Sequence, residues 1–217
     1  MYGNKQKRIG RFMPTHGSVR IIGDIHGEFA TYNLMRGFGP SIQIGDFGAG
    51  FSPYEELPKT SEHHRMIRGN HDNPAVIKNL PGYIPDGHHE GDWFFVGGAW
   101  SIDWAYRTEG VSWWPDEELS VGELYDIYDK YVMAKPRVMI THDGPSSVTN
   151  EMIISKGLSI SGKQIPTRTG QALDAMFQAH KPEYWFFGHY HVNVEENIMG
   201  TYFRCVASND FIDFVLR

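Results

Sequence analysis

Short apolar runs that end in polar residues recur along the chain, and they predict strands. The runs lack the strict alternation of a half-exposed strand, which is typical of strands covered on both faces in a layered α/β protein. Two more β-rich runs, 201–208 and 211–217, are expected to form a terminal antiparallel pair. The other predicted strands are 18–23, 41–45, 63–69, 92–100, 136–142 and 183–191.

Capping patterns and helical periodicity between these runs predict helices. Ser120 and Glu123 have the spacing of a capping box, and apolar residues at helical spacing follow them. A second helix is expected to begin near Thr169 and to stop before Pro182. The segment 24–37 indicates a turn followed by a third helix. Together with the strands, these helices predict an α/β fold.

Length and composition favour one globular domain. The chain has 217 residues, of which 41% are hydrophobic and 21% are charged, and this balance is typical of folded rather than disordered proteins. No internal repeat or long linker divides the sequence. We therefore expect a single domain over 1–217, in which 1–17 is considered as a loosely ordered N-terminal arm.

Charge and cysteine content narrow the classes of function. The net charge of −6 argues against stable binding of duplex nucleic acid. No apolar run is long enough to span a membrane, and residues 1–20 lack a signal-peptide core. Cys205 is the only cysteine, so an internal disulfide and a cysteine-rich zinc site are excluded. The expectation is a cytoplasmic protein without a membrane partner.

Polar residues with metal-binding or acid–base chemistry follow five of the predicted strands. Ligands bind at the carboxyl ends of strands in open α/β sheets, so these residues are expected to converge on one region. Any one of them alone is more often a turn or core residue, but five strand ends carrying them together predict a site. The residues are Asp24, His26, Asp46, Asn70, His71, His142, His189 and His191.

The motifs around these residues resemble one known family. The chain contains GDIHG at 23–27, GD at 45–46, GNHD at 69–72, THDGP at 141–145 and GHYH at 188–191. Five such blocks in this order resemble the calcineurin-like metallophosphoesterases, whereas a lone Gly-Asp would carry no weight. The resemblance implies a layered β-sandwich flanked by helices, with a dinuclear metal site.

The resemblance also assigns ligands to two divalent metal ions. Mixed imidazole and oxygen ligands suit Mn, which we favour, or Fe, Zn or Co. Asp46 belongs to both ligand sets because a carboxylate can bridge two ions. One ion would be held by Asp24, His26, Asp46 and His191, and the other by Asp46, Asn70, His142 and His189.

The implied reaction is hydrolysis of a phosphate monoester, in which a metal-bridging hydroxide attacks phosphorus. By the family pattern, His71 protonates the leaving oxygen or stabilises its charge. Asp72 is the carboxylate nearest in sequence that could orient His71. Arg68 has two interpretations that stay open: it binds phosphate oxygens, or it is an arginine in an ion pair.

The sequence departs from the phosphoprotein phosphatases, which it resembles in part. Their second block continues to a phosphate-binding arginine, but this chain has GDFGAGF at 45–51. A tryptophan-rich segment, 93–119, offers Arg107 as a replacement at the rim of the site. The alternative is that this segment only packs on the sheet, with Phe94 and Phe95 in the core.

Three functions remain open at this stage. The favoured one is a phosphatase acting on phosphoproteins or small phosphate esters. The second is a phosphodiesterase acting on cyclic nucleotides or nucleic-acid ends, so the expected partner is a phosphorylated protein, small ester or nucleotide. The third is a non-catalytic scaffold of the same fold. It is least favoured because all the expected metal ligands, including Asn70, and also His71 are present.

Overall fold

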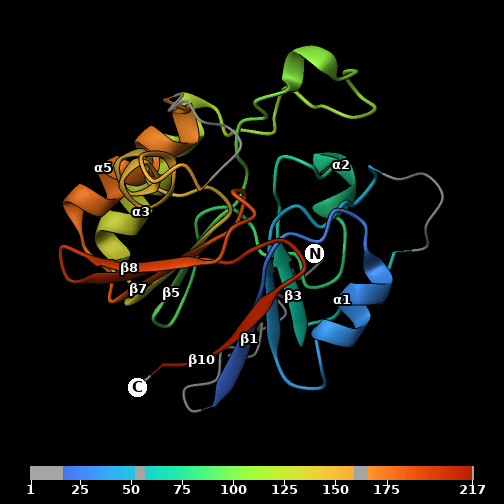
Figure 1. Cartoon of the computed structure of the whole chain (residues 1–217), viewed down its shortest axis with the longest axis horizontal. Helices are drawn as coiled ribbons and strands as arrows, with labels where there is room; N and C mark the ends of the chain where they lie inside the picture. Colours follow the sequence, from blue (N-terminus) through green and yellow to red (C-terminus); the bar gives the residue numbers. More distant parts are fainter. Residues whose placement is uncertain (1–16, 52–56, 159–165, 217) are drawn as a thin grey trace, which may run out of the picture.

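The computed structural model describes residues 17–51, 57–158 and 166–216 and arranges them as two packed sheets between helices (Figure 1). The first sheet has the strand order β10-β1-β2-β3. β1 pairs in parallel with β2 and antiparallel with β10, and β2 pairs in parallel with β3. The strands are β1 (Ser18–Ile22), β2 (Ser41–Ile44), β3 (His64–Ile67) and β10 (Phe211–Val215).

The second sheet has the order β4-β5-β6-β7-β9-β8. Its four central strands are parallel, and an antiparallel strand closes each edge. All residues of β5, β6 and most of β7 are buried, which agrees with their unbroken apolar sequences. The strands are β4 (His88–Glu90), β5 (Trp93–Val96), β6 (Val138–Thr141), β7 (Tyr184–Phe187), β8 (Val194–Ile198) and β9 (Thr201–Cys205).

Helices cover the outer faces of the two sheets. In Figure 1, α1 and α2 lie beside β3 of the first sheet, and α3 and α5 lie over the second. α3 begins with the predicted capping box: the Glu123 N–H donates to Ser120 Oγ, and the Ser120 N–H donates to Glu123 Oε2. The helices are α1 (Phe29–Met35), α2 (Pro74–Ile77), the 3-10 helix η1 (Trp104–Tyr106), α3 (Val121–Ala134), α4 (Ser146–Thr149), the π-helix η2 (Asn150–Ile154) and α5 (Arg168–Ala179).

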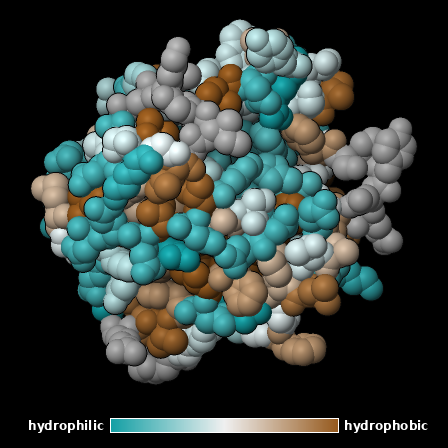
Figure 2. Space-filling view, viewed as in Figure 1, coloured by the Kyte–Doolittle hydropathy of each residue, from teal (hydrophilic) through white to brown (hydrophobic). Residues whose placement is uncertain are grey.

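The core has three layers, because each sheet buries both of its faces. One cluster lies between the sheets and joins residues such as Ile21 and Ile44 to Phe95 and Ile140. A second lies under α1 and α2, and a third lies under α3 and α5. On the face shown in Figure 2, the hydrophobic residues left outside occur in separate small groups among polar ones. The predicted layered α/β sandwich is confirmed.

One sequence-based expectation about strands was wrong. β9 and β10 do not pair with each other: β9 lies between β7 and β8, while β10 joins the other sheet beside β1. The ion pair between Arg20 of β1 and Asp213 of β10, at 2.8 Å, reinforces that pairing.

The remaining expectations concern the second helix, membrane spans and the domain organisation. The helix expected near Thr169 is α5, whose first turn is capped by the Thr167 hydroxyl accepting from the Gly170 N–H. Within the described ranges, no helix combines the length and apolarity needed to cross a bilayer. The single-domain organisation stays a prediction, and 1–16 lie outside the described residues.

Candidate metal centre

The polar residues singled out in the sequence lie where strands of both sheets end. Sequence reasoning expected them to converge on one region, and they do so from two sheets: β1, β2 and β3 belong to the first sheet, whereas β6 and β7 belong to the second. The centre therefore lies across the junction of the two sheets. Its members are Asp24 and His26 after β1, Asp46 after β2, Asn70 and His71 after β3, His142 after β6, and His189 and His191 after β7.

The first group of candidate ligands contains Asp24, His26, Asp46 and His191, whose donor atoms lie within 4.8 Å of one another. His26 Nε2 lies 2.9 Å from His191 Nε2, and His191 Nε2 lies 3.0 Å from Asp24 Oδ2. Two imidazole nitrogens and two carboxylates thus face one small volume. A divalent cation matches this donor set.

The second group contains Asp46, His142 and His189, again within 4.8 Å. The side-chain oxygen of Asn70 joins it, because Asn70 Oδ1 lies 3.0 Å from His142 Nε2 and 3.1 Å from His189 Nδ1. Asp46 is the member that both groups share. The structure therefore brings together the seven side chains that the sequence motifs predicted as ligands, in the two sets expected.

The backbone at these positions is unusual. His26, Asp46, His189 and His191 have positive φ angles of 48°, 55°, 66° and 56°, in the left-handed region that side chains with a Cβ rarely adopt. Such a conformation costs about 1–3 kcal/mol where the surrounding structure does not compensate for it, and it concentrates at functional sites. Four of the group members are held in this way.

Glycines next to the candidate ligands make the close approach of these segments feasible. A Cβ on Gly69 would overlap the carboxylate of Asp46, and a Cβ on Gly45 would overlap the ring of His142. Gly45 also has a φ of 100°, which only glycine adopts readily. The Gly-Asp and Gly-Asn-His motifs are thus explained by packing as well as by chemistry.

Hydrogen bonds from outside the two groups orient the candidate ligands. His142 Nδ1 donates to the Ile44 carbonyl at 2.9 Å, which leaves the Nε2 lone pair directed at the second group. The Asp24 carboxylate accepts from the backbone N–H of His189, and Asp46 Oδ1 accepts from the N–H of His71 at 2.7 Å. These bonds fix the geometry of the groups within the protein itself.

Charges in the centre are strongly coupled. Burial alone would raise the pKa of the Asp46 carboxyl, but His142, His71 and His26 hold it well below its usual range. Burial would likewise lower the pKa of His142, yet Asp46 raises it to about 10. A proton on His142 therefore occupies the position that a cation would take, and cation binding would release it.

His71 lies at the edge of both groups. Its Nδ1 lies 3.1 Å from His26 Nδ1 and 3.9 Å from Asp46 Oδ2, and the ring of Phe51 stacks on it with centroids 5.3 Å apart. Burial lowers the pKa of His71 to about 4; Asp46 opposes this shift and Arg107 adds to it. His71 Nε2 lies 2.6 Å from Arg107 Nη2.

Arg107 reaches the centre from the tryptophan-rich segment. In Figure 1 this segment rises beyond the strand ends, in green, and carries η1. The Arg107 guanidinium donates from Nε to Asp103 at 2.6 Å and from Nη1 to the Ser112 carbonyl at 3.1 Å. These bonds direct Nη2 at His71. The structure thus places Arg107, a residue outside every motif, at the rim of the candidate metal centre.

Arg68 lies elsewhere, and its contacts match the ion-pair interpretation rather than phosphate binding. Its side chain is 1% exposed, and Nε donates to Asp86 at 2.8 Å. Nη1 donates to the backbone carbonyls of Glu117 and Asp116 at 2.7 and 3.0 Å. Arg68 therefore fastens the end of the tryptophan-rich segment to β3, and we assign it no substrate contact.

Asp72 also has a role other than the one suggested by its place beside His71. Its buried carboxylate accepts four backbone hydrogen bonds of 2.8–3.2 Å, so it shapes the loop after Asp46 instead of orienting His71. Burial, together with the charge of Asp46, raises the pKa of Asp72 to about 6. The donors are the N–H groups of Phe47, Gly48, Ala49 and Gly69.

Sequence reasoning missed three residues of the centre. Phe51 stacks on His71. Ser101 accepts a hydrogen bond from Asn70 at 3.0 Å, and it donates one to Glu117 at 2.6 Å. The last two lie in an irregular segment without periodicity, so no pattern in the sequence points to them. Glu117 is 2% exposed, and a buried carboxylate indicates a specific partner, but this burial is known only from the structure.

With this geometry, comparison with known families becomes informative. A sequence profile described as calcineurin-like phosphoesterase matches residues 17–193. The chain belongs to this family. Calcineurin-like phosphoesterases use divalent metals and hydrolyse phosphate esters, and the two candidate ligand groups agree with that chemistry.

Solved structures also resemble this calcineurin-like phosphoesterase. A proposed 5′-nucleotidase from Staphylococcus aureus shows the same fold at 14% identity and a TM-score of 0.52; the match covers 92% of this chain and 50% of that one. A predicted phosphoesterase from Streptococcus pneumoniae TIGR4 has 14% identity and a TM-score of 0.41, with 90% and 75% covered. No curated protein sequence gives a significant match.

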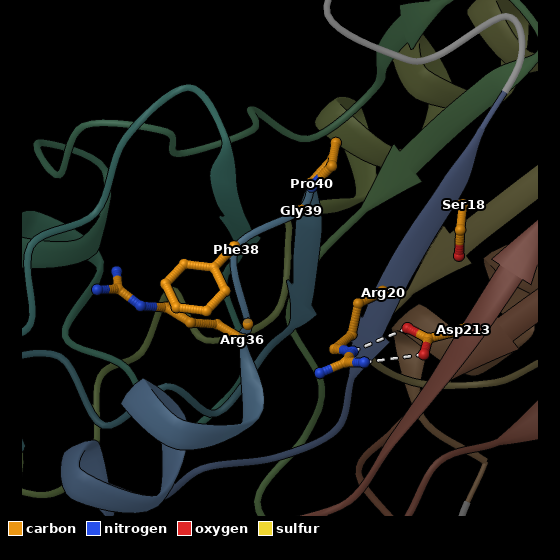
Figure 3. Close-up of a pocket in the computed structure, with 8 residues that line it drawn as sticks. Ser18, Arg20, Arg36, Phe38, Gly39, Pro40 and Asp213 are labelled. Atoms are coloured by element: carbon orange, nitrogen blue, oxygen red, sulfur yellow. Dashed lines mark hydrogen bonds and ion pairs between the residues drawn. The ribbon is translucent and has the colours of Figure 1, made fainter.

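A separate pocket of about 250 Å³ lies beside the ends of β1 and β2 that are opposite to the metal centre (Figure 3). Arg20 crosses it to pair with Asp213, and the exposed ring of Phe38 stands at its edge. It contains none of the candidate ligands of this phosphoesterase. Two arginines line the pocket: Arg20 pairs with Asp213, and Arg36 donates to the Lys59 carbonyl at 2.7 Å.

Proposed function

We propose that this chain hydrolyses phosphate monoesters with the help of two divalent cations, with Mn²⁺ as the first candidate. One observation carries the proposal: two ligand groups share Asp46, and a histidine and an arginine that are not ligands stand at their edge. Ligand groups alone would also fit a structural metal site. His71 and Arg107 supply the acid–base and anion-binding chemistry that a hydrolase needs.

The residues present fit two cations. The groups offer imidazole nitrogens, carboxylate oxygens and one amide oxygen, a mixture that suits Mn, Fe, Zn or Co better than Mg or Ca. Asp24 and Asp46 bring two negative charges against about four positive ones, so the centre would attract an anionic substrate. When bound, such cations lower the pKa of a water molecule and neutralise phosphoryl oxygens.

The tautomers of two histidines support a proton-donating role for His71. His26 faces the first group through Nε2, and an imidazole that ligates a cation through Nε2 keeps its hydrogen on Nδ1. His26 Nδ1 would then donate to His71 Nδ1, 3.1 Å away. His71 is therefore left with its hydrogen on Nε2, the nitrogen that points out of the centre. That hydrogen is available for the leaving oxygen of an ester.

The same reasoning assigns Arg107 to the substrate. With a hydrogen on His71 Nε2, this atom and Arg107 Nη2 would be two donors facing each other at 2.6 Å. An anionic oxygen would satisfy both, because it can accept from the guanidinium and from the imidazole. Each of these bonds needs about 2.7–2.9 Å, so Arg107 would have to move away from His71 to admit the oxygen. A monoester phosphate carries more negative charge than a diester, so the added positive charge of Arg107 favours monoesters.

A phosphodiesterase remains the second candidate because of exposed aromatic side chains on the same segment. Trp104 and Tyr106 are 47% and 94% exposed and shortly precede Arg107 in the sequence. Flat apolar surfaces at the rim of the centre would suit the second ester group of a diester, or a nucleotide base. A non-catalytic scaffold gains no support, since the predicted ligands and His71 all lie together.

A paired assay distinguishes these candidates. Protein stripped of metal and reloaded with Mn²⁺ is tested on p-nitrophenyl phosphate and on bis-p-nitrophenyl phosphate, with metal content measured in the same samples. Preference for the monoester supports our proposal, and preference for the diester replaces it with the second candidate. Two bound ions without activity on either ester, or on a panel of phosphopeptides and nucleotides, would contradict both.

A further inference from the structure

The side-chain amide of Asn70 could face the second ligand group with either its oxygen or its NH₂ group. The oxygen is a metal ligand, whereas the NH₂ group is a donor and repels a cation. In the structure, Oδ1 faces His142 Nε2 and His189 Nδ1, at 3.0 and 3.1 Å. The side chain is 2% exposed, so solvent does not decide its orientation. Something within the protein has to fix it.

A buried chain of hydrogen bonds lies on the other side of the amide. Asn70 Nδ2 donates to Ser101 Oγ at 3.0 Å, and Ser101 Oγ donates to Glu117 Oε2 at 2.6 Å. Glu117 Oε1 accepts from the backbone N–H of Ser101 at 2.8 Å. Ser101 and Glu117 are each 2% exposed, as is Asn70. The chain has one direction, because an ionised carboxylate can only accept.

We propose that Ser101 and Glu117 are positioning residues that hold the Asn70 amide with its oxygen toward the second cation position. The inference rests on the proposed function, because it assumes that this position takes a cation. Glu117 accepts the hydrogen bond that the Ser101 hydroxyl donates. The Ser101 oxygen is then left as an acceptor, and only the NH₂ end of Asn70 can satisfy it. The oxygen end is thereby turned toward His142 and His189.

The surrounding structure holds Glu117 in place for this task. Its backbone carbonyl accepts from Arg68 Nη1 at 2.7 Å, and Arg68 is itself paired with Asp86. Gly97 donates to Asp86 at 2.6 Å and Gly98 donates to the Arg68 carbonyl at 2.8 Å, so both limbs of the tryptophan-rich segment are fastened at its base. The hydrogen-bond chain Glu117–Ser101–Asn70 therefore starts at a residue that is itself fastened to the rest of the protein.

Glu117→Gln reverses the direction of the hydrogen bonds in the chain Glu117–Ser101–Asn70 while keeping the shape of the side chain. The backbone N–H of Ser101 still needs an acceptor, so the glutamine oxygen takes that bond and its NH₂ group faces Ser101 Oγ. Ser101 must then donate its hydrogen to Asn70 instead. The amide would turn its oxygen toward Ser101 and its NH₂ group toward the cation position, and affinity for the second cation should fall.

Asn70→Asp supplies a rescue that a merely structural role would not produce. In the Glu117→Gln protein, Ser101 donates toward residue 70, and an aspartate there can accept while its other oxygen faces the cation. The double variant should therefore recover the affinity that Glu117→Gln loses. Because an aspartate also adds negative charge, which raises cation affinity by itself, the gain from Asn70→Asp should be larger in the Glu117→Gln protein than in wild type; equal gains would indicate general loosening of the segment.

The experiment measures Mn²⁺ binding by titration calorimetry, with bound metal counted after gel filtration. Changes to residues that orient a ligand typically cost about 10–100-fold in metal affinity. We expect that loss for one of the two ions, the one at the position next to Asn70, in Glu117→Gln and in Ser101→Ala, with the other ion unaffected. Glu118→Gln is the matched control, since the Glu118 carboxylate accepts from the Thr169 N–H, away from the centre.

The outcomes separate this inference from the proposed function. If Glu117→Gln and Ser101→Ala bind both ions as tightly as wild type, or if Asn70→Asp fails to restore the loss, the positioning role is wrong. Failure of wild type itself to bind two ions would instead contradict the proposed function. Ser101→Ala keeps the test decisive if Glu117→Gln does not fold, and thermal melting without metal identifies that case.

Discussion

The neighbours of His71 determine what this imidazole can do with a proton. Burial lowers its pKa to about 4, and the proposed tautomer of His26 leaves hydrogen on the outward nitrogen of His71. To pass this hydrogen to a leaving oxygen without becoming an imidazolate, His71 would take up a hydrogen at Nδ1 from His26 Nδ1, and His26 would regain one from water. Such help matters most when the leaving group is a strong base.

His71→Ala should therefore retain both cations but lose turnover in a way that depends on the leaving group. General acid catalysis contributes about 10²–10⁴-fold, so we expect a loss of that order for alkyl phosphates and a much smaller one for p-nitrophenyl phosphate. Turnover of a series of esters with increasing leaving-group pKa, measured beside metal content, checks this. An equal loss across the series would argue against proton donation.

Arg107 should act on substrate affinity rather than on folding. A hydrogen bond to a charged group is worth about 1.5–3 kcal/mol, so Arg107→Ala should lower kcat/KM by roughly 10–100-fold and weaken inhibition by inorganic phosphate. Arg107→Lys should recover only part, since it lacks the guanidinium fork. Arg20→Ala, in the ion pair with Asp213 far from the centre, is the control. Unchanged turnover and affinity in Arg107→Ala would remove the assignment.

At the scale of elements, the tryptophan-rich segment depends on Arg68. Its buried ion pair with Asp86 and its two bonds to backbone carbonyls hold that segment against β3. Removal of one partner from a buried ion pair typically costs about 3–5 kcal/mol, because the other charge stays buried. Arg68→Ala should thus lower the free energy of unfolding by that amount, as measured with urea.

A result of the opposite kind would restore the phosphate-binding interpretation of Arg68. Unaltered stability together with a raised KM is what a substrate contact predicts. Asp86→Asn offers a matched test, because it removes the charge facing Arg68 without touching the candidate ligands. Both variants should destabilise the protein if the ion pair is structural.

Sequence patterns predicted the elements that local interactions determine. The capping box of α3 and the apolar runs of β5, β6 and β7 are complete within a few residues, so a short stretch shows them. The pairing of β10 with β1 joins residues almost two hundred positions apart, as in the bond between Arg20 and Asp213, and no local pattern records it.

The same distinction applies to the candidate centre. The candidate ligands sit in short motifs, each of which ends a strand, and the structure brings them together. For Asp72, adjacency to His71 was misleading, because its side chain accepts from backbone N–H groups. For Arg68, the sequence left two interpretations open, and its contact with Asp86 matches the ion pair. The role of Ser101 could not be predicted from the sequence, because it depends on a hydrogen bond to Glu117, which lies farther along an irregular segment.

At the scale of the whole molecule, the candidate centre joins the two sheets. Asp24, His26, Asp46 and Asn70 come from the first sheet, and His142, His189 and His191 come from the second. Each ligand group contains members from both. Without cations, the carboxylates and imidazoles are held together only by protons and by hydrogen bonds. Cations bound there would therefore stabilise the packing of one sheet on the other.

Removal of metal should accordingly lower the melting temperature. A cation that binds only the folded state stabilises it by about 2.7 kcal/mol at a concentration one hundred times its Kd. Melting in EDTA and in Mn²⁺ measures the difference, and Asp46→Asn is the informative variant because both groups share this carboxylate. That variant should bind less metal and respond weakly to EDTA. If it keeps both ions and full activity, Asp46 is not the bridge; if wild type melts identically in both conditions, the cations do not link the sheets.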